Sequence, residues 1–315
     1  MKSLSKNKLT TEQINTITKQ AFDHIPKGYT ENEIGEFSAL YVIELADKRV
    51  ILKVAPKDSI RVLRYEKNAM RREVEALRLV KANTNVPVPE VLFYDTSKTL
   101  CDSEYFFMEK INGDNFNSIS GELTAEQNSS IITQLGSFNR QLNEIKSDKF
   151  GYDNQFDDWK TAFLNMIFDL LKDGKDMDVK LPLPYEEIEN IINSFIFACE
   201  DVKKSQLVHW DLWNGNALVR DGKISGIIDF ERSLFGDYLM EFYFRKCTLN
   251  KDFNTGYGID LTTLDKKANI RLALYDLYLV IVWVVEYYYR EYEKSQLAWR
   301  EEEFIKACKA FEKFY

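Results

Sequence analysis

The stretch LVHWDLWNGN, residues Leu207–Asn216, decides how the rest of this sequence is interpreted. An apolar entry, typical of a buried strand, leads directly into a cluster of His, Asp and Asn side chains. The chain has only two histidines, and His209 in this cluster is one of them. Polar groups gathered at the end of a strand predict a functional site, although Asp and Asn are also common in turns and a single His can be a core residue.

A hairpin follows this stretch. Asp221-Gly222 lies between two short apolar runs, which is the strongest short-range hairpin signal. A two-residue turn there pairs Arg220 with Lys223. Counted outward in the same register, Asn216 lies opposite Ile227.

Asp229 lies two residues beyond Ile227, on the face that Asn216 shares, and is therefore a diagonal neighbour within side-chain reach. Asp211 lies in the loop that leads into the hairpin. A carboxylate, an amide oxygen and a second carboxylate suit Mg²⁺, which uses few protein oxygens and keeps places for water and phosphate. The spacing predicts a metal and phosphate site.

Composition indicates a globular protein with a large core. The chain has 315 residues, of which 45% are hydrophobic and 14% aromatic, and its formal net charge is −8. That charge argues against a nucleic-acid surface, and it fits either simple solubility or a cationic small-molecule partner. The four cysteines form no C-x-x-C pair, so neither a zinc site nor a disulfide framework is expected: Cys101, Cys199, Cys247 and Cys308.

No targeting or membrane segment is apparent. The N-terminus lacks an apolar stretch long enough for a signal peptide. The longest strongly apolar run, Leu277–Val285, is much shorter than the roughly 20 residues of a membrane span. We expect a cytoplasmic protein without a membrane partner.

The periodicity up to residue 110 predicts a small sheet with helices. Pro87 and Pro89 indicate that one of its strands lies at an edge, or that the prolines are confined to the opening residues of that strand. The expected elements are a helix over Thr11–Phe22 opened by Thr10 and Gln13, strands over Phe37–Leu45 and Arg49–Ala55, a helix over about Ile60–Lys81, and strands in VPVPEVLFYD and EYFFMEKI.

The remainder is predicted to be mostly helical after a break at Asn112-Gly113-Asp114. Helices are expected from Thr124 to Leu142, from Phe156 to about Lys172, from Tyr185 to Glu200, and between Leu264 and Tyr315. The pattern predicts an α+β fold, with a β-rich lobe at 1–110 and a larger α-rich lobe at 111–315.

Three motifs carry a resemblance to a known family. HWDLWNGN, IIDFE and FGDYLMEF match the pattern H-x-D-x-x-x-x-N, I-D-F and G-D. The sequence resembles the aminoglycoside phosphotransferase and choline kinase-like family, small-molecule kinases with a protein-kinase-like bilobal fold. The similarity extends from about Gly35 to at least Arg245.

The resemblance implies roles for the clustered side chains. Asp211 would orient the attacking hydroxyl and accept its proton, and Asn216 and Asp229 would hold Mg²⁺ at the nucleotide phosphates. His209 would pack beneath the loop and bond backbone, while Asp237 would brace the loop from below.

The first lobe would supply the nucleotide contacts. Lys53 interrupts an apolar strand and resembles the phosphate-binding lysine, although edge strands also use lysine against aggregation. Its acid partner would be Glu73 by the motif, with Glu66 and Glu75 as rivals. Further contacts with ATP or GTP would come from Gly35 and Ser38 in a phosphate-covering loop. The backbone between the two lobes would supply others, at Met108, Glu109, Lys110 and Ile111.

The acceptor stays open. Trp210 stands where the family commonly has Gly, and Glu241 replaces a frequent Asp; neither change removes a catalytic group. Acidic stretches at Asp153, Asp157, Asp158 and Glu301 to Glu303, and the aromatics Trp283, Tyr287, Tyr288, Tyr289 and Trp299, would suit a cation. Solvated helix faces explain the acidic side chains equally well, and a helical stripe of aromatic residues is more often part of the core.

The resemblance therefore predicts a small-molecule O-kinase whose acceptor is aminoglycoside-like, an amino alcohol or a sugar. A nucleotide-binding regulatory module without catalysis is the alternative. A protein kinase is a weaker one, because no Ala-Pro-Glu segment follows Asp229.

Overall fold

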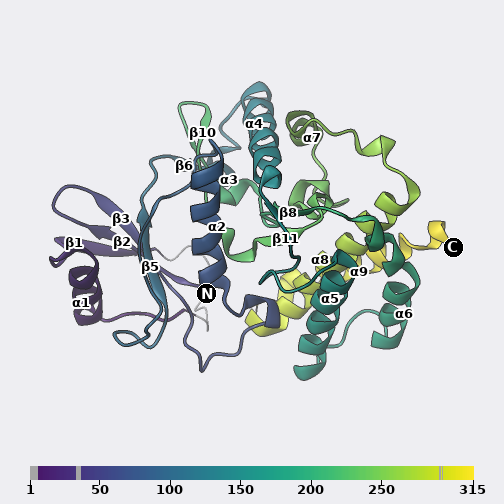
Figure 1. The fold of residues 1–315 in the computed structure, drawn as a ribbon, viewed down its shortest axis with the longest axis horizontal. Helices are drawn as coiled ribbons and strands as arrows, with labels where there is room; N and C mark the ends of the chain where they lie inside the picture. The colour runs from purple at the N-terminus through teal and green to yellow at the C-terminus, as the bar shows by residue number, and fades with distance from the viewer. Residues whose placement is uncertain (1–5, 33–36, 291, 293) are drawn as a thin grey trace.

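The computed structural model describes residues 6–32, 37–290, 292 and 294–315. A five-stranded antiparallel sheet forms the N-terminal part, and a larger, mainly helical part follows (Figure 1). This architecture confirms the predicted α+β, protein-kinase-like fold. The strand order is β1-β2-β3-β5-β4, with β1 at Gly28–Asn32, β2 at Ala39–Glu44, β3 at Arg49–Val54, β4 at Val91–Asp95 and β5 at Tyr105–Glu109.

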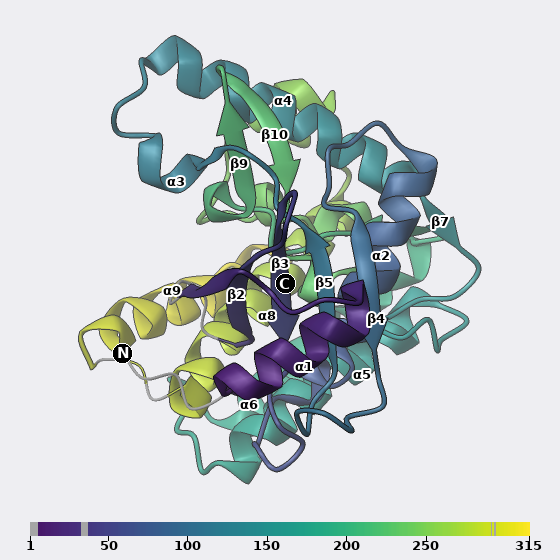
Figure 2. The ribbon, with the colours of Figure 1, turned by 90° about the vertical axis from the view of Figure 1, so that its left-hand side faces the viewer.

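The two faces of this sheet bury different cores, because side chains alternate along a strand. Phe106 of β5 belongs to the large core that includes α2 (Ala69–Asn83), whereas Phe107 faces α1 (Thr11–Phe22) on the other side. Figure 2 shows α1 lying across the sheet on the face away from the helical part. The edge position predicted for β4 from its prolines is confirmed. Strand β1 was not predicted.

Two helix starts are confirmed by their capping boxes. The Thr10 hydroxyl accepts from the Gln13 N–H, and the Gln13 side chain accepts from the Thr10 N–H. Thr124 and Gln127 do the same at the start of α4 (Ala125–Glu144). Each pair satisfies two backbone donors that the first helical turn leaves unpaired.

The helix predicted from about Ile60 begins only at Ala69, so that part of the prediction was wrong. Residues 55–68, which we call the connector, contain only one short helical turn, at Arg64–Glu66. The backbone N–H of Arg64 donates to Asp173 in the helical part at 2.8 Å. Asn68 then takes a left-handed backbone with φ of 60°. Contacts with distant residues thus override the local helical pattern.

The helical part holds two small three-stranded sheets, ordered β10-β9-β6 and β11-β8-β7. Their strands are β6 at Asp114–Asn115, β7 at Lys146–Ser147, β8 at Ser205–Val208, β9 at Ala217–Arg220, β10 at Lys223–Ile227 and β11 at Leu234–Gly236. The remaining helices are α3 at Phe116–Ile119, α5 at Trp159–Asp176, α6 at Tyr185–Phe195, α7 at Lys251–Tyr257, α8 at Lys266–Arg290 and α9 at Leu297–Lys309.

Helix α8 is the centre of this part. By length and composition it is the one helix in the described ranges apolar enough to cross a membrane, with a mean hydropathy of 1.6 over its best window. Within the fold, 72% of that window is buried. The C-terminal stretch predicted as helical divides into α8 and α9, which pack together through Trp283 and Trp299 with ring centroids 4.9 Å apart.

Helices α4 and α7 pack with unusually close backbones. A Cβ added at Gly136 would lie 2.1 Å from the Phe253 carbonyl oxygen, and one added at Gly256 would lie 1.8 Å from that of Thr133. Only glycine fits such an approach. The contact matters for the site because α4 carries Asn143, whose amide donates to Glu241 near the His209 loop.

Gly136→Ala should therefore lower the free energy of unfolding by about 1–3 kcal/mol, because the methyl group forces α7 away from α4. Gly121→Ala is the matched control, since a Cβ there meets no atom within 4 Å. Urea unfolding of both variants measures the difference. Equal stability of the two variants would contradict the close packing.

Candidate active site

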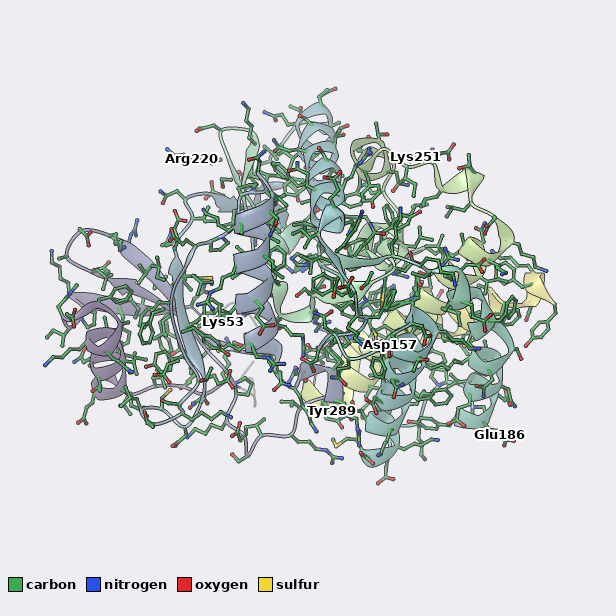
Figure 3. All side chains as sticks on the ribbon, in the orientation of Figure 1. Lys53, Asp157, Glu186, Arg220, Lys251 and Tyr289 are labelled. Carbon is green, nitrogen blue, oxygen red and sulfur yellow. The ribbon has the colours of Figure 1, made fainter. Side chains whose placement is uncertain are left out.

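The Lys53 ammonium lies among three carboxylates. Its Nζ is 2.6 Å from Glu73 of α2, 2.8 Å from Asp229 after β10, and 3.0 Å from Glu231. Figure 3 labels Lys53 at the sheet beside α2. Three segments far apart in the sequence thus meet at one cation between the sheet and the helical part.

The two rival acids are engaged elsewhere. Glu66 pairs with Arg290 of α8 and accepts from the Leu63 N–H at 2.8 Å. Glu75 is exposed and lies 3.8 Å from Arg71. The Lys53 partner on α2 is therefore Glu73, as the motif predicted.

Electrostatics keep Lys53 and Asp229 charged, whereas burial raises the pKa of Glu73 to about 8 against the attraction of the Lys53 ammonium. Burial acts to lower the pKa of Lys53, but the carboxylates of Asp229, Glu231 and Glu73 outweigh it and raise the pKa well above its ordinary value. Burial also acts to raise the pKa of Asp229, yet the Lys53 ammonium holds that pKa below its usual range. Because three carboxylates face one ammonium, the cluster favours a further cation.

The hairpin register differs from the prediction by one residue. Arg220 pairs with Lys223 as expected, but a bulge at Ser225 places Ile227 opposite Ala217. The backbone of Asn216 consequently bonds Ile228, at 3.0 Å, and not Ile227. Close packing against the segment after β5 accompanies the bulge, since a Cβ on Gly226 would lie 2.6 Å from Ile111.

The two predicted metal ligands are linked through the backbone, since the N–H of Ile228, the residue before Asp229, donates to the Asn216 carbonyl. The Asn216 amide donates through Nδ2 to the Asp211 carbonyl at 2.8 Å, so its Oδ1 is left as an acceptor. Asp229 keeps 37% of its side chain exposed and has a left-handed backbone with φ of 67°. A non-glycine residue in that conformation is strained, and such strain concentrates at functional sites.

These donors fit Mg²⁺. The carboxylates of Glu73, Asp229 and Glu231 have oxygens within 4.8 Å of one another. All are hard oxygen ligands, and the set contains no His or Cys, which softer metals prefer.

Asp211 is partly withdrawn from solvent beside this cluster. Its side chain is 25% exposed, and its nearest cation among the described residues is Arg232, with Nε 3.9 Å from the Asp211 Oδ2. Burial raises the pKa of Asp211 to about 7, against the opposing attraction of Arg232. A carboxyl group with such a pKa is suited to accept and release a proton near neutral pH.

Two side chains hold the loop before Asp211: His209, as predicted, and Glu241, which takes the role predicted for Asp237. His209 is fully buried and bonds the Ile228 carbonyl through Nε2 at 3.1 Å, as predicted. Glu241 braces the loop, because its carboxylate accepts from the N–H groups of His209 and Trp210 at 3.0 and 3.3 Å. Asp237, predicted for that role, instead bonds Tyr275 and another residue of α8, Arg271. The prediction for Asp237 was wrong because the longer side chain at 241 reaches the loop.

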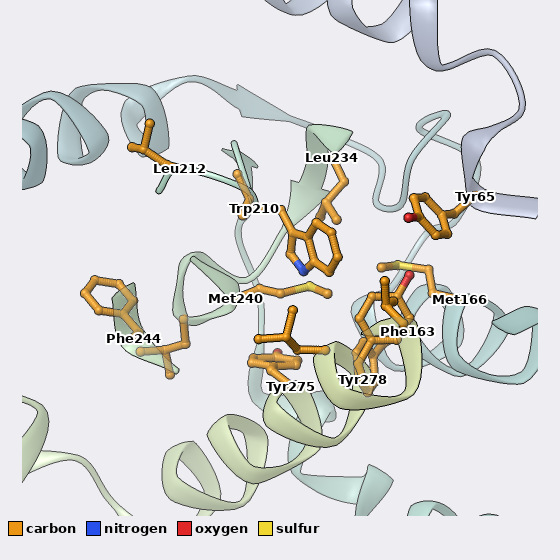
Figure 4. Close-up of a cluster of buried hydrophobic side chains, with 14 of the residues drawn as sticks. Tyr65, Phe163, Met166, Trp210, Leu212, Leu234, Met240, Phe244, Tyr275 and Tyr278 are labelled. Carbon is orange, nitrogen blue, oxygen red and sulfur yellow. The ribbon is translucent and has the colours of Figure 1, made fainter. Parts of the chain in front are cut away.

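Trp210 occupies a backbone position that favours glycine. Its φ is 67°, in the left-handed region, which explains why the family commonly has Gly there. In Figure 4 the indole lies between Leu234 and Met240, and its ring centroid is 5.8 Å from that of Tyr278. The strain costs about 1–3 kcal/mol. Burial of a large aromatic ring offsets a cost of that size.

The other predicted nucleotide contacts are only partly accounted for. Gly35 lies outside the described residues, and Ser38 is buried immediately before β2. Met108 and Glu109 are paired within the sheet, and the Glu109 N–H donates to the Glu90 carbonyl. The backbone groups of Lys110 and Ile111, which follow β5, are the remaining candidates for contacts with the nucleotide.

Most of the acidic side chains expected to bind a cation already form ion pairs or cap a helix within the protein. Asp153 lies 3.2 Å from Arg71, Asp157 pairs with Lys149, and Asp158 caps α5. Glu302 and Glu303 both pair with Lys306. Trp283 and Trp299 pack against each other, whereas the exposed indole of Trp213 is only two residues after Asp211. Trp213 is therefore the better candidate for an aromatic contact with the acceptor.

Sequence reasoning missed Glu231, Arg232 and Glu286. Glu231 and Arg232 directly follow the I-D-F motif, so proximity to Asp229 was the available signal. Glu286 directly follows the apolar run Leu277–Val285. Its contact with Arg232, at 2.7 Å, joins segments 54 positions apart and had no local signal.

Comparison with known proteins shows the family and the fold of the chain. The model of the phosphotransferase enzyme family matches residues 31–245. A putative fructosamine-3-kinase from Haemophilus somnus has a TM-score of 0.69 and 18% identity over 94% of this chain and 97% of its own. The aminoglycoside phosphotransferase APH(4)-Ia, in a complex with AMP-PNP and hygromycin B, has a TM-score of 0.67 and 13% identity over 95% and 98%.

Sequence relatives match a shorter segment. Subtelomeric hrmA-associated cluster proteins from two strains of Aspergillus fumigatus are each 25% identical over 129 residues, which is 40% of this chain. The match spans about a quarter of the length of those curated relatives.

The fold and the clustered side chains define a kinase-like protein. Because the family model covers about two thirds of the sequence, the chain belongs to the phosphotransferase enzyme family.

The buried His209 predicts a specific loss of stability in acid. Burial lowers the pKa of His209 to about 4 in the folded protein, whereas the ordinary pKa of a histidine is 6.5. Between these two pH values the unfolded chain binds a proton at His209 and the folded protein does not. Stability is therefore full above pH 6.5 and falls toward pH 4, by about 2 kcal/mol at pH 5.

Urea unfolding from pH 7.5 to 5 of wild type and His209→Gln measures this loss. The glutamine amide can replace the Nε2–H donor to Ile228, and other titrating groups cancel in the comparison. A wild type that loses no more stability than the variant would contradict a neutral, buried His209.

Proposed function

We propose that this protein transfers the γ-phosphoryl group of ATP or GTP, bound with Mg²⁺, to a hydroxyl group of a small molecule. The observation that carries the proposal is the contact of Lys53 with Glu73 and Asp229, which joins both lobes at one charge cluster. Family membership and the presence of Asp211 beside that cluster support the same activity.

Each side chain has a part in this reaction. Lys53, held by Glu73, would contact the nucleotide phosphates, and the oxygens of Asn216 and Asp229 would hold Mg²⁺. The bound metal would neutralise charge that develops on the phosphate oxygens. The acceptor hydroxyl gives its proton to Asp211 as its oxygen bonds the γ-phosphorus. The bond from that phosphorus to the β–γ bridging oxygen breaks, and the nucleoside diphosphate leaves.

The structure offers more to a hydroxyl compound than to a polycation. The acidic side chains expected to attract a cation are engaged in local ion pairs, and a guanidinium, that of Arg232, lies nearest to Asp211. Within the proposed acceptor class of aminoglycoside-like compounds, amino alcohols and sugars, this environment favours the members with the least positive charge. Solved relatives hold hygromycin B or streptomycin together with a nucleotide.

A thermal-shift screen of nucleotides with Mg²⁺, alone and combined with aminoglycosides, amino alcohols and sugars, tests the proposal. A ligand at 100 times its dissociation constant stabilises the folded state by about 2.7 kcal/mol. We expect a shift with ATP or GTP, and a further shift with the acceptor. Absence of any nucleotide-dependent shift in the presence of Mg²⁺ would refute the proposed function.

Asp211→Asn should abolish most of the turnover and spare nucleotide binding. The amide keeps the size of the side chain but cannot accept the proton, so we expect kcat to fall by about 10²- to 10⁴-fold. Phosphoryl transfer assays give kcat, and calorimetry gives the nucleotide affinity. Asp157→Asn is the control, because that acid is exposed and pairs only with Lys149. Retained turnover in Asp211→Asn would remove Asp211 from the catalytic role.

A further inference from the structure

A row of alternating charges runs from Asp211 into the last third of the chain. Arg232 lies 3.9 Å from Asp211 and donates to Glu286 of α8 at 2.7 Å. Glu286 also lies 3.9 Å from Arg290, one turn further along α8, and Arg290 pairs with Glu66 of the connector. The row thus reaches from the catalytic carboxylate to the N-terminal lobe.

Glu286 is the central member of this row. It is 5% exposed, and it follows the apolar run Leu277–Val285 of α8. Residues 31–245 match the family model, so Glu286 lies outside the matched segment. A buried acid usually costs more than it contributes to stability unless it is paired, and replacing such a pair by apolar groups is often neutral. Stability alone therefore gives little reason for a carboxylate at this position.

The geometry gives a functional reason. The Arg232 guanidinium is fixed on three sides: Glu286 holds its Nη2, and the rings of Trp210 and Tyr65 lie 5.4 and 5.7 Å away. The Arg232 atom closest to Asp211 is Nε, which lies 3.9 Å from Oδ2. Without Glu286, the Arg232 side chain is free to turn toward other carboxylates, because Asp229 and Glu231 also interact electrostatically with the groups around Asp211.

We propose that Glu286 is a positioning residue for the phosphoryl transfer. By fixing Arg232 at the edge of the Asp211 carboxylate, it holds that carboxylate where it can receive the proton of the acceptor hydroxyl. The inference rests on the proposed function, and it assigns to α8, far from the motifs in sequence, a part in the reaction.

Glu286→Gln tests this role, since it removes the charge and keeps the size. A small misplacement of a reacting group reduces the rate strongly, so we expect kcat to fall by about 10- to 100-fold. The KM for the nucleotide should stay close to that of wild type, the melting temperature should fall because Arg232 loses a buried partner, and Glu286→Asp should restore part of kcat. Wild-type kcat in a folded Glu286→Gln variant would overturn the proposal.

Asp276→Asn is the matched control. Asp276 is a partly buried acid on the same helix, but it accepts from the Lys246 N–H and faces Arg245, away from Asp211. Its kcat should equal that of wild type. An equal loss of kcat in Asp276→Asn and Glu286→Gln would show a general effect of α8 acids and overturn the proposal.

A double variant covers the case in which Glu286→Gln does not fold. Arg232→Met combined with Glu286→Met removes both charges together, which leaves no unpaired buried charge. We expect a folded protein with a low kcat. Full activity in this double variant would show that the pair is only structural.

A crystal structure of the folded variant, Glu286→Gln or the double one, separates this inference from the proposed function. The proposal expects the Asp211 carboxylate to leave its wild-type orientation, whether or not an acceptor is known. An unchanged Asp211 overturns the positioning role. If the wild type transfers phosphate to no acceptor, the proposed function fails, and the orientation of Asp211 alone decides the positioning role.

Discussion

The charge cluster at Lys53 is the constraint on which the arrangement of the two lobes depends. Its ammonium joins Glu73, 20 positions away on α2, and Asp229, 176 positions away after β10. Burying that cation is unfavourable unless carboxylates surround it, so α2 and the loop after β10 must both reach it. The same requirement brings Asn216 and Asp211 close by, because the Asn216 backbone bonds the residue before Asp229 and its amide bonds the Asp211 carbonyl.

A second tie runs through the connector. Its residues leave β3, cross to the helical part and return to α2, with Arg64 bound to Asp173 of α5 and Glu66 bound to Arg290 of α8. Arg72, at the start of α2, donates to backbone carbonyls of the connector and to that of Glu231. The helix that carries Glu73 is therefore fastened to the helical part at its N-terminal end. The position of Glu73 thus depends on contacts of both lobes.

Sequence patterns correctly predicted the elements that depend on interactions between residues close together in the sequence. The capping boxes at Thr10 and Thr124, the hairpin turn at Asp221-Gly222 and the edge position of β4 all rest on residues adjacent in sequence. The motifs also led to Lys53 and Glu73. The errors arose where distant contacts decide the structure: the connector is not helical because of Asp173, the bulge at Ser225 shifts the hairpin, and Glu241 takes the place expected for Asp237. No single-sequence pattern contains those contacts.

The most direct test of this account is a crystal structure of the protein with Mg²⁺ and a non-hydrolysable analogue of the nucleotide that it binds. The account predicts Lys53 Nζ within hydrogen-bond distance of the phosphates, with oxygens of Asn216 and Asp229 on the metal. Phosphates bound away from Lys53, or a metal held by other residues, would contradict it.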